Sequence, residues 1–260
     1  MRTRELTLHE RIRNADASQQ VENIKAEHAY LHGRADTVGE FSRLWALNDD
    51  SSWGHAFGRM RGKDQIWFGA VSYYDMQAMQ HFIDIFRKYP EAGGKDPRTL
   101  LEASVHTLVT DIIEVASDGM SARGEFLTPG LIQSKLMPDE PYCMILWERY
   151  GSDFVFEDGR WKYFHEQCCP DINGELDKTN WARDDYQMNC RTEGVDTYQP
   201  EQGTGTVPPP VAEPGPLHDV YSCVLPPKNT VPWPEPYDTM DDNNTYAAFR
   251  SHKTDGSGKQ

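Results

Sequence analysis

The spacing of hydrophobic positions changes along the chain, and its first third reads as helical. In residues 17–46 apolar side chains recur at steps of three and four, the period of a helix with one buried face. Gly33 and Gly39 weaken the middle of this stretch and predict a division into two helices. A second apolar stripe runs from residue 63 to about residue 88 and ends at Pro90.

From residue 105 onward the period shortens to two, which predicts strands. A hairpin is expected to turn at Asp158-Gly159, because this pair tolerates the positive φ of tight turns. Helices followed by a meander of strands predict an α+β fold, in which N-terminal helices cover a cone-shaped, curved antiparallel sheet. The expected strands are a short one near residues 53–60, then 105–116, 120–128, 142–150, 153–156 and 160–167.

Proline is concentrated in the last part of the chain, where 11 of the 17 prolines lie from Pro200 onward. Proline lacks the backbone donor that helices and central strands need. We therefore predict an α+β barrel domain in residues 1–172 and an extended, largely irregular arm in residues 173–260. Apolar side chains such as Trp233 and Tyr237 predict that the arm packs on the barrel or on a neighbouring subunit, with only about the last ten residues mobile.

The charge of the chain excludes several classes of partner. Its 260 residues include 26 Lys+Arg and 41 Asp+Glu, a formal net charge of −15, which opposes general binding to nucleic acid or anionic membranes. No long apolar run and no apolar leader are present, so a cytoplasmic protein is expected. The five cysteines lack Cys-x-x-Cys spacing, which argues against a disulfide framework and a structural zinc site.

Motif searches leave acid–base catalysis as the chemistry to consider. The glycine-rich nucleotide loops, His-Glu-x-x-His and Gly-x-Ser-x-Gly are absent, so no cofactor is predicted. His28 and His32 have a spacing at which two imidazoles can share a metal, but the sequence implies no third ligand, and no metal is predicted. His106 on a strand and Asp36 in the helical region could form an acid–base pair. Each also has an ordinary reading, Asp36 as a helix N-cap and His106 as a hydrogen-bonded, noncatalytic residue.

Six segments carry further motifs in a fixed order. They are residues 24–45, 49–53 with an acidic pair before a tryptophan, 57–66, 106–115, 117–122 and 157–162. Together they resemble SnoaL-like members of the nuclear transport factor 2-like superfamily over about residues 17–172. The resemblance to its scytalone dehydratase-like and hexachlorocyclohexane dehydrochlorinase-like branches implies a catalytic dyad of Asp36 and His106. Thr110 departs from this pattern, because the family usually has asparagine there.

A barrel of this kind with a long C-terminal extension also resembles the sphingomonad diarylpropane γ-formaldehyde lyases. This resemblance implies a cofactor-independent lyase that removes formaldehyde and water from a lignin-derived 1,2-diarylpropane-1,3-diol to give a stilbene. The alternatives are a dehydratase or isomerase of another aromatic or polyketide-like substrate, and a noncatalytic ligand- or protein-binding module.

Aromatic side chains in the helices and strands favour a flat aromatic ligand in a hydrophobic pocket. Arg59 and Arg61 are two residues apart on the expected first strand, where a guanidinium could hold an oxyanion. The expected partners are a small aromatic substrate and further copies of the chain, in a dimer or trimer. The candidate substrate-binding residues are Tyr30, His32, Trp45, Trp53, His55, Arg59, Arg61, Tyr74, Trp147 and His165.

Overall fold

The computed structural model describes residues 2–34, 36–55, 58–72, 102–134, 143–175, 231–241 and 244–247, and these form an α+β fold. The helical elements are α1 (Leu8–His32), α2 (Thr37–Leu44), α3 (Gly62–Ile66) and the π-helical η1 (Trp67–Ser72). The strands are β1 (Ser52–His55), β2 (Gly58–Arg61), β3 (Glu102–His106), β4 (Val109–Val115), β5 (Ser121–Ser134), β6 (Cys143–Glu157) and β7 (Arg160–Glu175).

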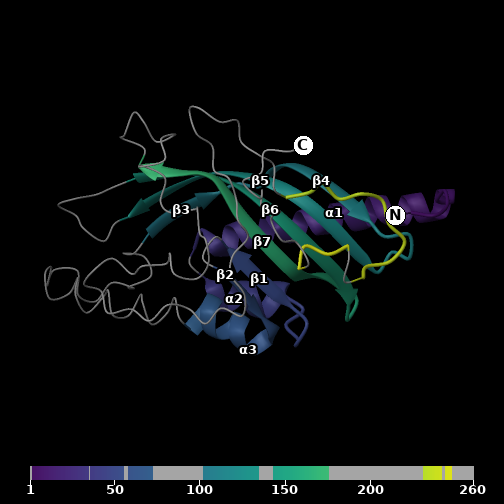
Figure 1. The fold of residues 1–260 in the computed structure, drawn as a ribbon, viewed down its shortest axis with the longest axis horizontal. Coiled ribbons are helices and arrows are strands. Elements are labelled where there is room, and N and C mark those ends of the chain that lie inside the picture. Colours follow the sequence, from purple (N-terminus) through teal and green to yellow (C-terminus); the bar gives the residue numbers. More distant parts are fainter. Residues whose placement is uncertain are drawn as a thin grey trace, which may run out of the picture.

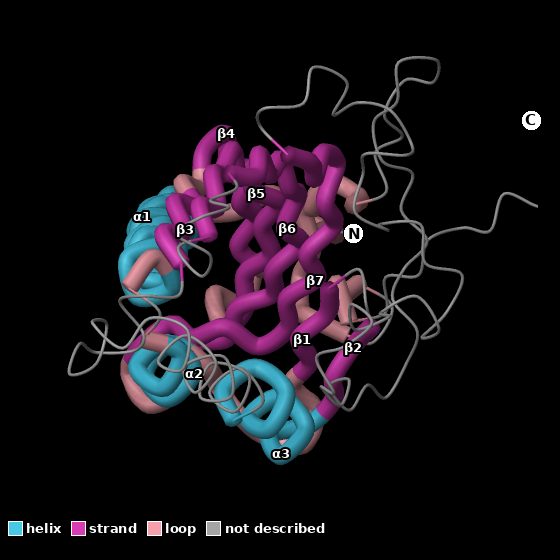
Figure 2. Tube along the Cα trace, turned by 90° about the vertical axis from the view of Figure 1, so that its left-hand side faces the viewer, coloured by secondary structure: helices cyan, strands magenta, loops and turns pink. Residues whose placement is uncertain are grey.

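One curled sheet organises these elements, in the order β2-β1-β7-β6-β5-β3 with β4 also paired to β5. The helices lie along its concave side, and α1 packs against β7, β4 and β3 (Figures 1 and 2). The predicted α+β fold is therefore confirmed. Two details differ: β1 pairs with β7 in parallel, and the described strands curl without closing into a barrel.

The first helix begins earlier than its apolar pattern predicts. Thr7 and Glu10 form a capping box, in which the Thr7 side chain accepts from the Glu10 N–H and the Glu10 carboxylate accepts from the Thr7 N–H. The helix ends at Gly33, as predicted. Gly39 lies inside α2 instead of between the helices. Glycine suits this position because a Cβ there would lie 2.5 Å from the Asp36 carboxylate, which caps α2.

The strand boundaries show where glycine and register misled the prediction. The single strand expected near residues 53–60 is two antiparallel strands, β1 and β2, and residues 105–116 divide between β3 and β4. Thr110 has a φ of 55° and lies at a register shift of β4, which interrupts the expected alternation. Gly151 does not end a strand, because β6 continues through it. Glycine stands at this position because a Cβ there would lie 2.4 Å from the Tyr246 ring.

The remaining predictions of elements have mixed outcomes. The turn at Asp158-Gly159 is confirmed, with the positive φ values of 52° and 77° that a tight hairpin turn of this type requires. Strand β7 continues to Glu175, past the domain boundary predicted at residue 172. The helix predicted for residues 63–88 is α3 and η1 as far as Ser72, and its remainder lies outside the described residues.

Part of the C-terminal arm lies on the convex face of the sheet. The backbone N–H of Tyr246 donates to Asp153 at 2.7 Å, and the N–H of Ser117 donates to the Tyr237 carbonyl at 3.0 Å. The N-terminal segment joins it, because the Arg2 N–H donates to the Pro236 carbonyl at 2.7 Å (Figure 1). Val231, Tyr237 and Tyr246 are almost fully buried. Residues 176–230 of the predicted arm, which follow the end of β7, lie outside the described residues, as do the last ten residues.

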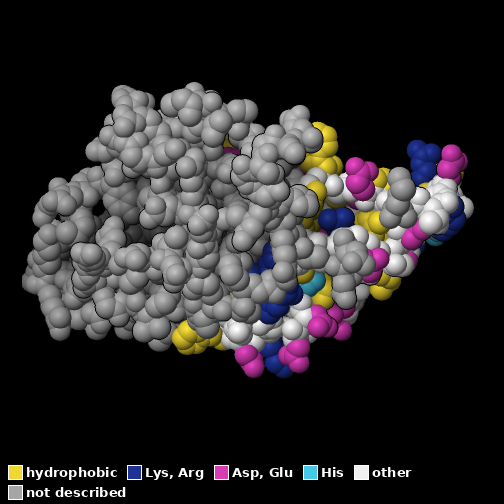
Figure 3. Space-filling view, in the orientation of Figure 1, with side chains coloured by type: hydrophobic (Ala, Val, Ile, Leu, Met, Phe, Trp, Pro, Cys, Tyr) yellow, Lys and Arg dark blue, Asp and Glu magenta, His cyan; other side chains and the backbone are white. Residues whose placement is uncertain are grey.

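The described surface mixes charges of both signs. On the face shown in Figure 3, Lys and Arg side chains lie beside Asp and Glu side chains across the described part. In that part of the chain, no helix has the length and apolar character needed to cross a membrane.

Asp153 makes the contact between the sheet and the arm dependent on pH. Burial raises its pKa to about 7, against the opposing effects of Arg123 and the Tyr246 N–H. As the pH rises, the unfolded chain releases this proton first, so the free energy of unfolding falls between about pH 4 and pH 7. The Asp153→Asn side chain keeps an oxygen that accepts from the Tyr246 N–H, but it does not titrate.

We expect the Asp153→Asn variant to gain stability relative to the wild type, by up to about 4 kcal/mol, as the pH rises from about 4 to about 7. Thermal melting at a series of pH values measures this difference, and Asp111→Asn at an exposed position is the matched control. A difference that stays constant with pH would contradict the assignment.

Candidate functional site

A cavity of about 540 Å³ opens between α1 and the strands β3, β4 and β5. Lys25 and Phe126 form its inner wall and are almost fully buried, whereas Tyr30 lies at its rim and is 73% exposed. Val105 and Thr107 also line it, on either side of His106 in the chain. The cavity therefore connects solvent with a charged group in the interior of the cone.

Lys25 forms a buried ion pair inside the cone. Its Nζ lies 3.0 Å from Oε2 of Glu166 and 3.3 Å from the hydroxyl of Ser152, and the two charged side chains are 2% and 1% exposed. The pair joins α1 to the central strand β7. Burial lowers the pKa of the Lys25 ammonium, and Glu166 opposes this shift. An amine with a lowered pKa can accept a proton near neutral pH.

Aromatic rings surround this ion pair. The Lys25 Nζ lies 4.5 Å from the centre of the Phe126 ring and 5.0 Å from the centres of the Tyr150 and Tyr163 rings. The Tyr150 hydroxyl donates to Glu148 at 2.7 Å, and burial raises the pKa of Tyr150 well above its usual value. The Lys25 ammonium and the Tyr150 hydroxyl therefore lie among apolar groups, where little water is present.

Several buried polar atoms of the interior have no hydrogen-bond partner among the described residues. They include the Tyr163 hydroxyl, the Trp45 Nε1 and the Thr128 hydroxyl. Buried polar groups are nearly always paired, with protein, water or ligand.

A second polar cluster joins the end of α1 to α2. His28 Nδ1 lies 3.0 Å from Oε1 of Glu40, and His32 Nδ1 lies 3.5 Å from Oε2 of the same carboxylate. The His28 and Glu40 side chains are almost fully buried, and that of His32 is 39% exposed. Burial acts to raise the pKa of Glu40, but the two imidazoles outweigh it and lower the pKa to about 2.

The structure places three of the predicted substrate-binding residues near this interior. Trp45 is buried with its ring stacked on Tyr163 at 5.3 Å, and His32 belongs to the cluster with Glu40. Trp53 is half-buried and meets the Phe41 ring edge-on.

Arg59, Arg61 and His165 lie on the other side of the sheet. The Arg59 guanidinium donates to Gln167 of β7 at 2.8 Å. The preceding residue of β7, Glu166, binds Lys25. Successive residues of a strand face opposite sides of the sheet, so Arg59 and Lys25 lie on opposite faces. Arg59 and Arg61 both donate to the Ala247 carbonyl. The strand alternation therefore places these three residues on the face of the sheet opposite Lys25, and their role in substrate binding stays a prediction.

His165 has a neutral imidazole in this outer layer. Its Nδ1 lies 3.1 Å from the Ser52 hydroxyl. Burial, together with the nearby charges of Arg59 and Arg61, lowers its pKa to about 3. It is therefore a hydrogen-bonding group at neutral pH.

Asp36 serves as the N-cap of α2, where its carboxylate accepts from the Gly39 N–H at 2.9 Å. The backbone of His106 ends β3 and pairs with Gly130. The side chains of His106 and His55 and all of Tyr74 lie outside the described residues, so the dyad stays a prediction. Trp147 is on β6 and 38% exposed.

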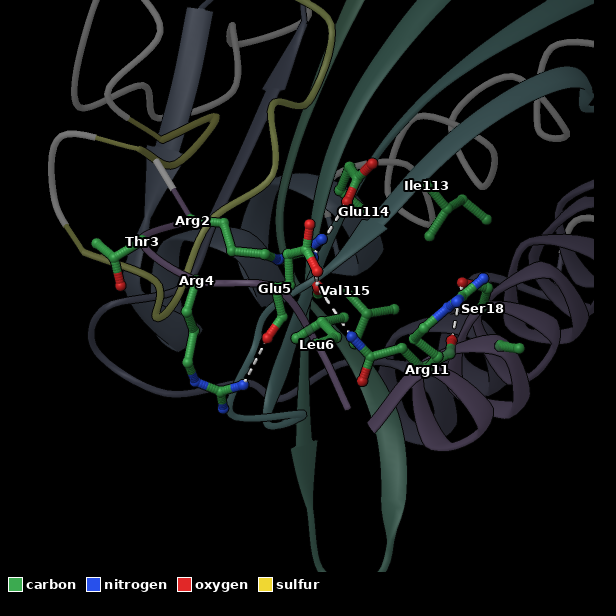
Figure 4. A pocket seen from close by; sticks show the side chains of 12 residues that line it. Arg2, Thr3, Arg4, Glu5, Leu6, Arg11, Ser18, Ile113, Glu114 and Val115 are labelled. Carbon is green, nitrogen blue, oxygen red and sulfur yellow. Dashed lines mark hydrogen bonds and ion pairs between the residues drawn. The ribbon is translucent and has the colours of Figure 1, made fainter. Parts of the chain in front are cut away.

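A larger cavity of about 840 Å³ lies between the N-terminal segment, α1 and β4 (Figure 4). Two of its arginines already pair with the chain: Arg2 lies 3.5 Å from Glu114, and Arg4 donates to the Glu5 carbonyl at 3.1 Å. Ion pairs of this exposed kind are weak and common. We therefore assign the candidate site to the smaller cavity, whose wall carries a buried amine.

Sequence reasoning missed Lys25, Glu40 and Glu166. Lys25 lies four residues after Val21 and three before His28, on the buried stripe of α1. A lysine among apolar helix positions is a signal that could have found it, because a buried ammonium needs a partner. Glu166 follows no such local pattern, and only the sheet brings it to Lys25.

No protein-family model and no curated protein matches the chain. Solved structures that are similar include a protein described as a scytalone dehydratase from Novosphingobium aromaticivorans, at 15% identity and a TM-score of 0.43 over 63% of this chain and 93% of that one. A hexachlorocyclohexane dehydrochlorinase from Novosphingobium barchaimii is 14% identical, with a TM-score of 0.42 over 66% and 95%. A nuclear transport factor 2-like protein with a cystatin-like fold, also from N. aromaticivorans, is 16% identical, with a TM-score of 0.40 over 68% and 94%.

These are proteins of the kinds that the sequence motifs resemble. Their TM-scores lie below 0.5, so the likeness by itself establishes neither a family nor an activity for this chain.

Substitutions at Asp36 separate its capping role from its predicted catalytic role. Asn is as good an N-cap as Asp, so Asp36→Asn should keep the melting temperature, whereas Asp36→Ala should lose about 1 kcal/mol of stability. If the carboxylate also orients His106, Asp36→Asn loses turnover while its stability is unchanged. Melting curves and activity of both variants test this; full activity in Asp36→Asn would leave Asp36 as a cap.

The Lys25–Glu166 pair predicts strongly non-additive stability. Lys25→Met leaves the Glu166 carboxylate buried without its cation, which should cost about 3–5 kcal/mol. Lys25→Met combined with Glu166→Gln removes both charges and should recover most of that loss. Denaturant unfolding of the two single variants and the double variant gives the coupling, and additive effects would contradict a direct buried pair.

Proposed function

We propose that the chain is a lyase that works by acid–base catalysis, without a cofactor, on an aromatic alcohol bound inside the cone. The observation that carries this proposal is the buried Lys25–Glu166 pair at the inner wall of a cavity of about 540 Å³. A general base needs a partly dry site and a shifted pKa, and burial lowers the pKa of Lys25 in the required direction.

The lining of the interior supports an aromatic substrate with hydroxyl groups. Phe126, Tyr150 and Tyr163 place their rings around the Lys25 ammonium, and such surfaces stack well on flat rings. The hydroxyls of Tyr163 and Thr128, which lack a partner among the described residues, match substrate hydroxyls. Our specific proposal is a lignin-derived 1,2-diarylpropane-1,3-diol.

In the proposed reaction, the deprotonated form of Lys25, which burial favours over the ammonium, accepts the proton of the γ-hydroxyl. The bond between the β and γ carbons breaks, formaldehyde leaves, and the electron pair forms the double bond of the stilbene as the benzylic C–O bond breaks. The departing hydroxyl takes a proton and leaves as water. The diol thus gives stilbene, formaldehyde and water with no external oxidant or reductant.

The acid in this proposal is His106, oriented by Asp36. These two roles are the ones that the resemblance of the sequence motifs implies. A histidine suits this role because its usual pKa lies close to neutral pH. Glu166 keeps Lys25 in place and stabilises its charged form after proton transfer.

We expect the wild-type protein to convert the diol to stilbene and formaldehyde in equal amounts without an added cofactor. Stilbene absorbance and a formaldehyde assay measure the two products. Lys25→Met/Glu166→Gln should lose turnover by at least about 100-fold, the usual contribution of a general base. Lys63→Met, at an exposed lysine, is the matched control and should keep full activity.

Each of the following outcomes would overturn the proposal. Full activity in the double variant would exclude Lys25 as the base. Loss of water without formaldehyde, across a panel of aromatic alcohols, would identify a dehydratase, and rearrangement alone would identify an isomerase. Binding of the panel without turnover would identify a noncatalytic binding module.

A further inference from the structure

The second polar cluster brings together side chains typical of a transition-metal site. His28 and His32 lie four residues apart on the last turn of α1, with ring centres 5.6 Å apart and planes inclined by 16°. This spacing places both imidazoles on one face of the helix. The sequence predicts no third ligand for them, because the third residue comes from another helix.

Glu40 supplies the third group because the chain folds back after Gly33. The break between α1 and α2 lets α2 pack against α1, and Glu40 points its carboxylate at both imidazoles. One donor atom from each of the three residues lies within 4.8 Å of the others. The three side chains are therefore close enough for their donor atoms to bind one ion together.

The donor set defines the class of metal. Two imidazole nitrogens and one carboxylate oxygen suit Zn²⁺, Co²⁺ and similar divalent transition metals, and are poor ligands for Mg²⁺ or Ca²⁺. Among the described residues, His28 Nδ1 and Glu40 Oε2 are buried without a hydrogen bond of acceptable geometry, although His28 Nδ1 lies 3.0 Å from Glu40 Oε1. An ion between the three side chains would be coordinated by these atoms in place of the ion pairs.

We propose that His28, His32 and Glu40 bind one divalent transition-metal ion of the zinc class. The half-exposed side chain of His32 lets the ion reach the site from solvent. Three protein ligands leave a position open for water or another small ligand, the pattern of open rather than structural zinc sites. The elimination proposed above does not use this ion, so the two proposals stand or fall separately.

Metal titration of the full chain tests the site directly. Protein treated with EDTA and dialysed is titrated with Zn²⁺ in a calorimeter and with Co²⁺ by visible absorption. We expect one ion per chain and a visible Co²⁺ spectrum of low coordination number. His32→Ala, at a half-exposed position, should weaken binding at least about tenfold while leaving the fold intact.

Two further variants make the result decisive. Glu40→Gln should also weaken binding, and its circular dichroism spectrum reports whether it folds. His9→Ala, at an exposed position on α1, is the matched histidine control and should bind as the wild type does. Absence of binding in the wild type, or equal binding in His32→Ala and the wild type, would overturn the proposal. Turnover of the EDTA-treated wild type is measured separately and bears only on the lyase.

Discussion

The interior of the cone depends on the buried ion pair between Lys25 of α1 and Glu166 of β7. Two charges removed from water are tolerated only when they meet, and here they meet at 3.0 Å. A shift of α1 by one turn along the sheet would leave both of them buried and unpaired. The pair therefore sets the position of α1 on β7. It also fixes the position of His28, which lies about one turn after Lys25 on the same buried face of α1.

The two faces of the sheet are both polar in places, but for different reasons. On the convex face, Asp153 and Arg59 bind backbone groups of residues 246 and 247, so their polar atoms hold the chain in place. On the concave face, the hydroxyls of Thr128 and Tyr163 have no partner among the described residues. The cavity and the buried amine also belong to the concave face. The concave face is thus the one on which we propose that the substrate binds, whereas the contacts on the convex face hold residues 246 and 247.

How much could be predicted from the sequence follows from the range of the interactions concerned. The end of α1 at Gly33, the Asp158-Gly159 turn and the α+β order depend on neighbouring residues, and the sequence predicts them. Gly151 was misread because glycine serves both in turns and where another chain segment packs closely. Glu40 and Glu166 reach their partners only through helix packing and sheet pairing, for which local periodicity carries no signal.

Tyr163 connects the two polar clusters of the interior. Its ring stacks on Trp45 at 5.3 Å, lies 5.6 Å from His28, and faces the Lys25 ammonium at 5.0 Å. Burial raises the pKa of its hydroxyl well above the usual value, so Tyr163 stays neutral throughout the range in which proteins function. A neutral phenol in this position cannot serve as a base, but it can donate a hydrogen bond to an oxygen that gains negative charge. In the proposed reaction, Lys25 therefore moves the proton and Tyr163 is suited to stabilise the charge that results.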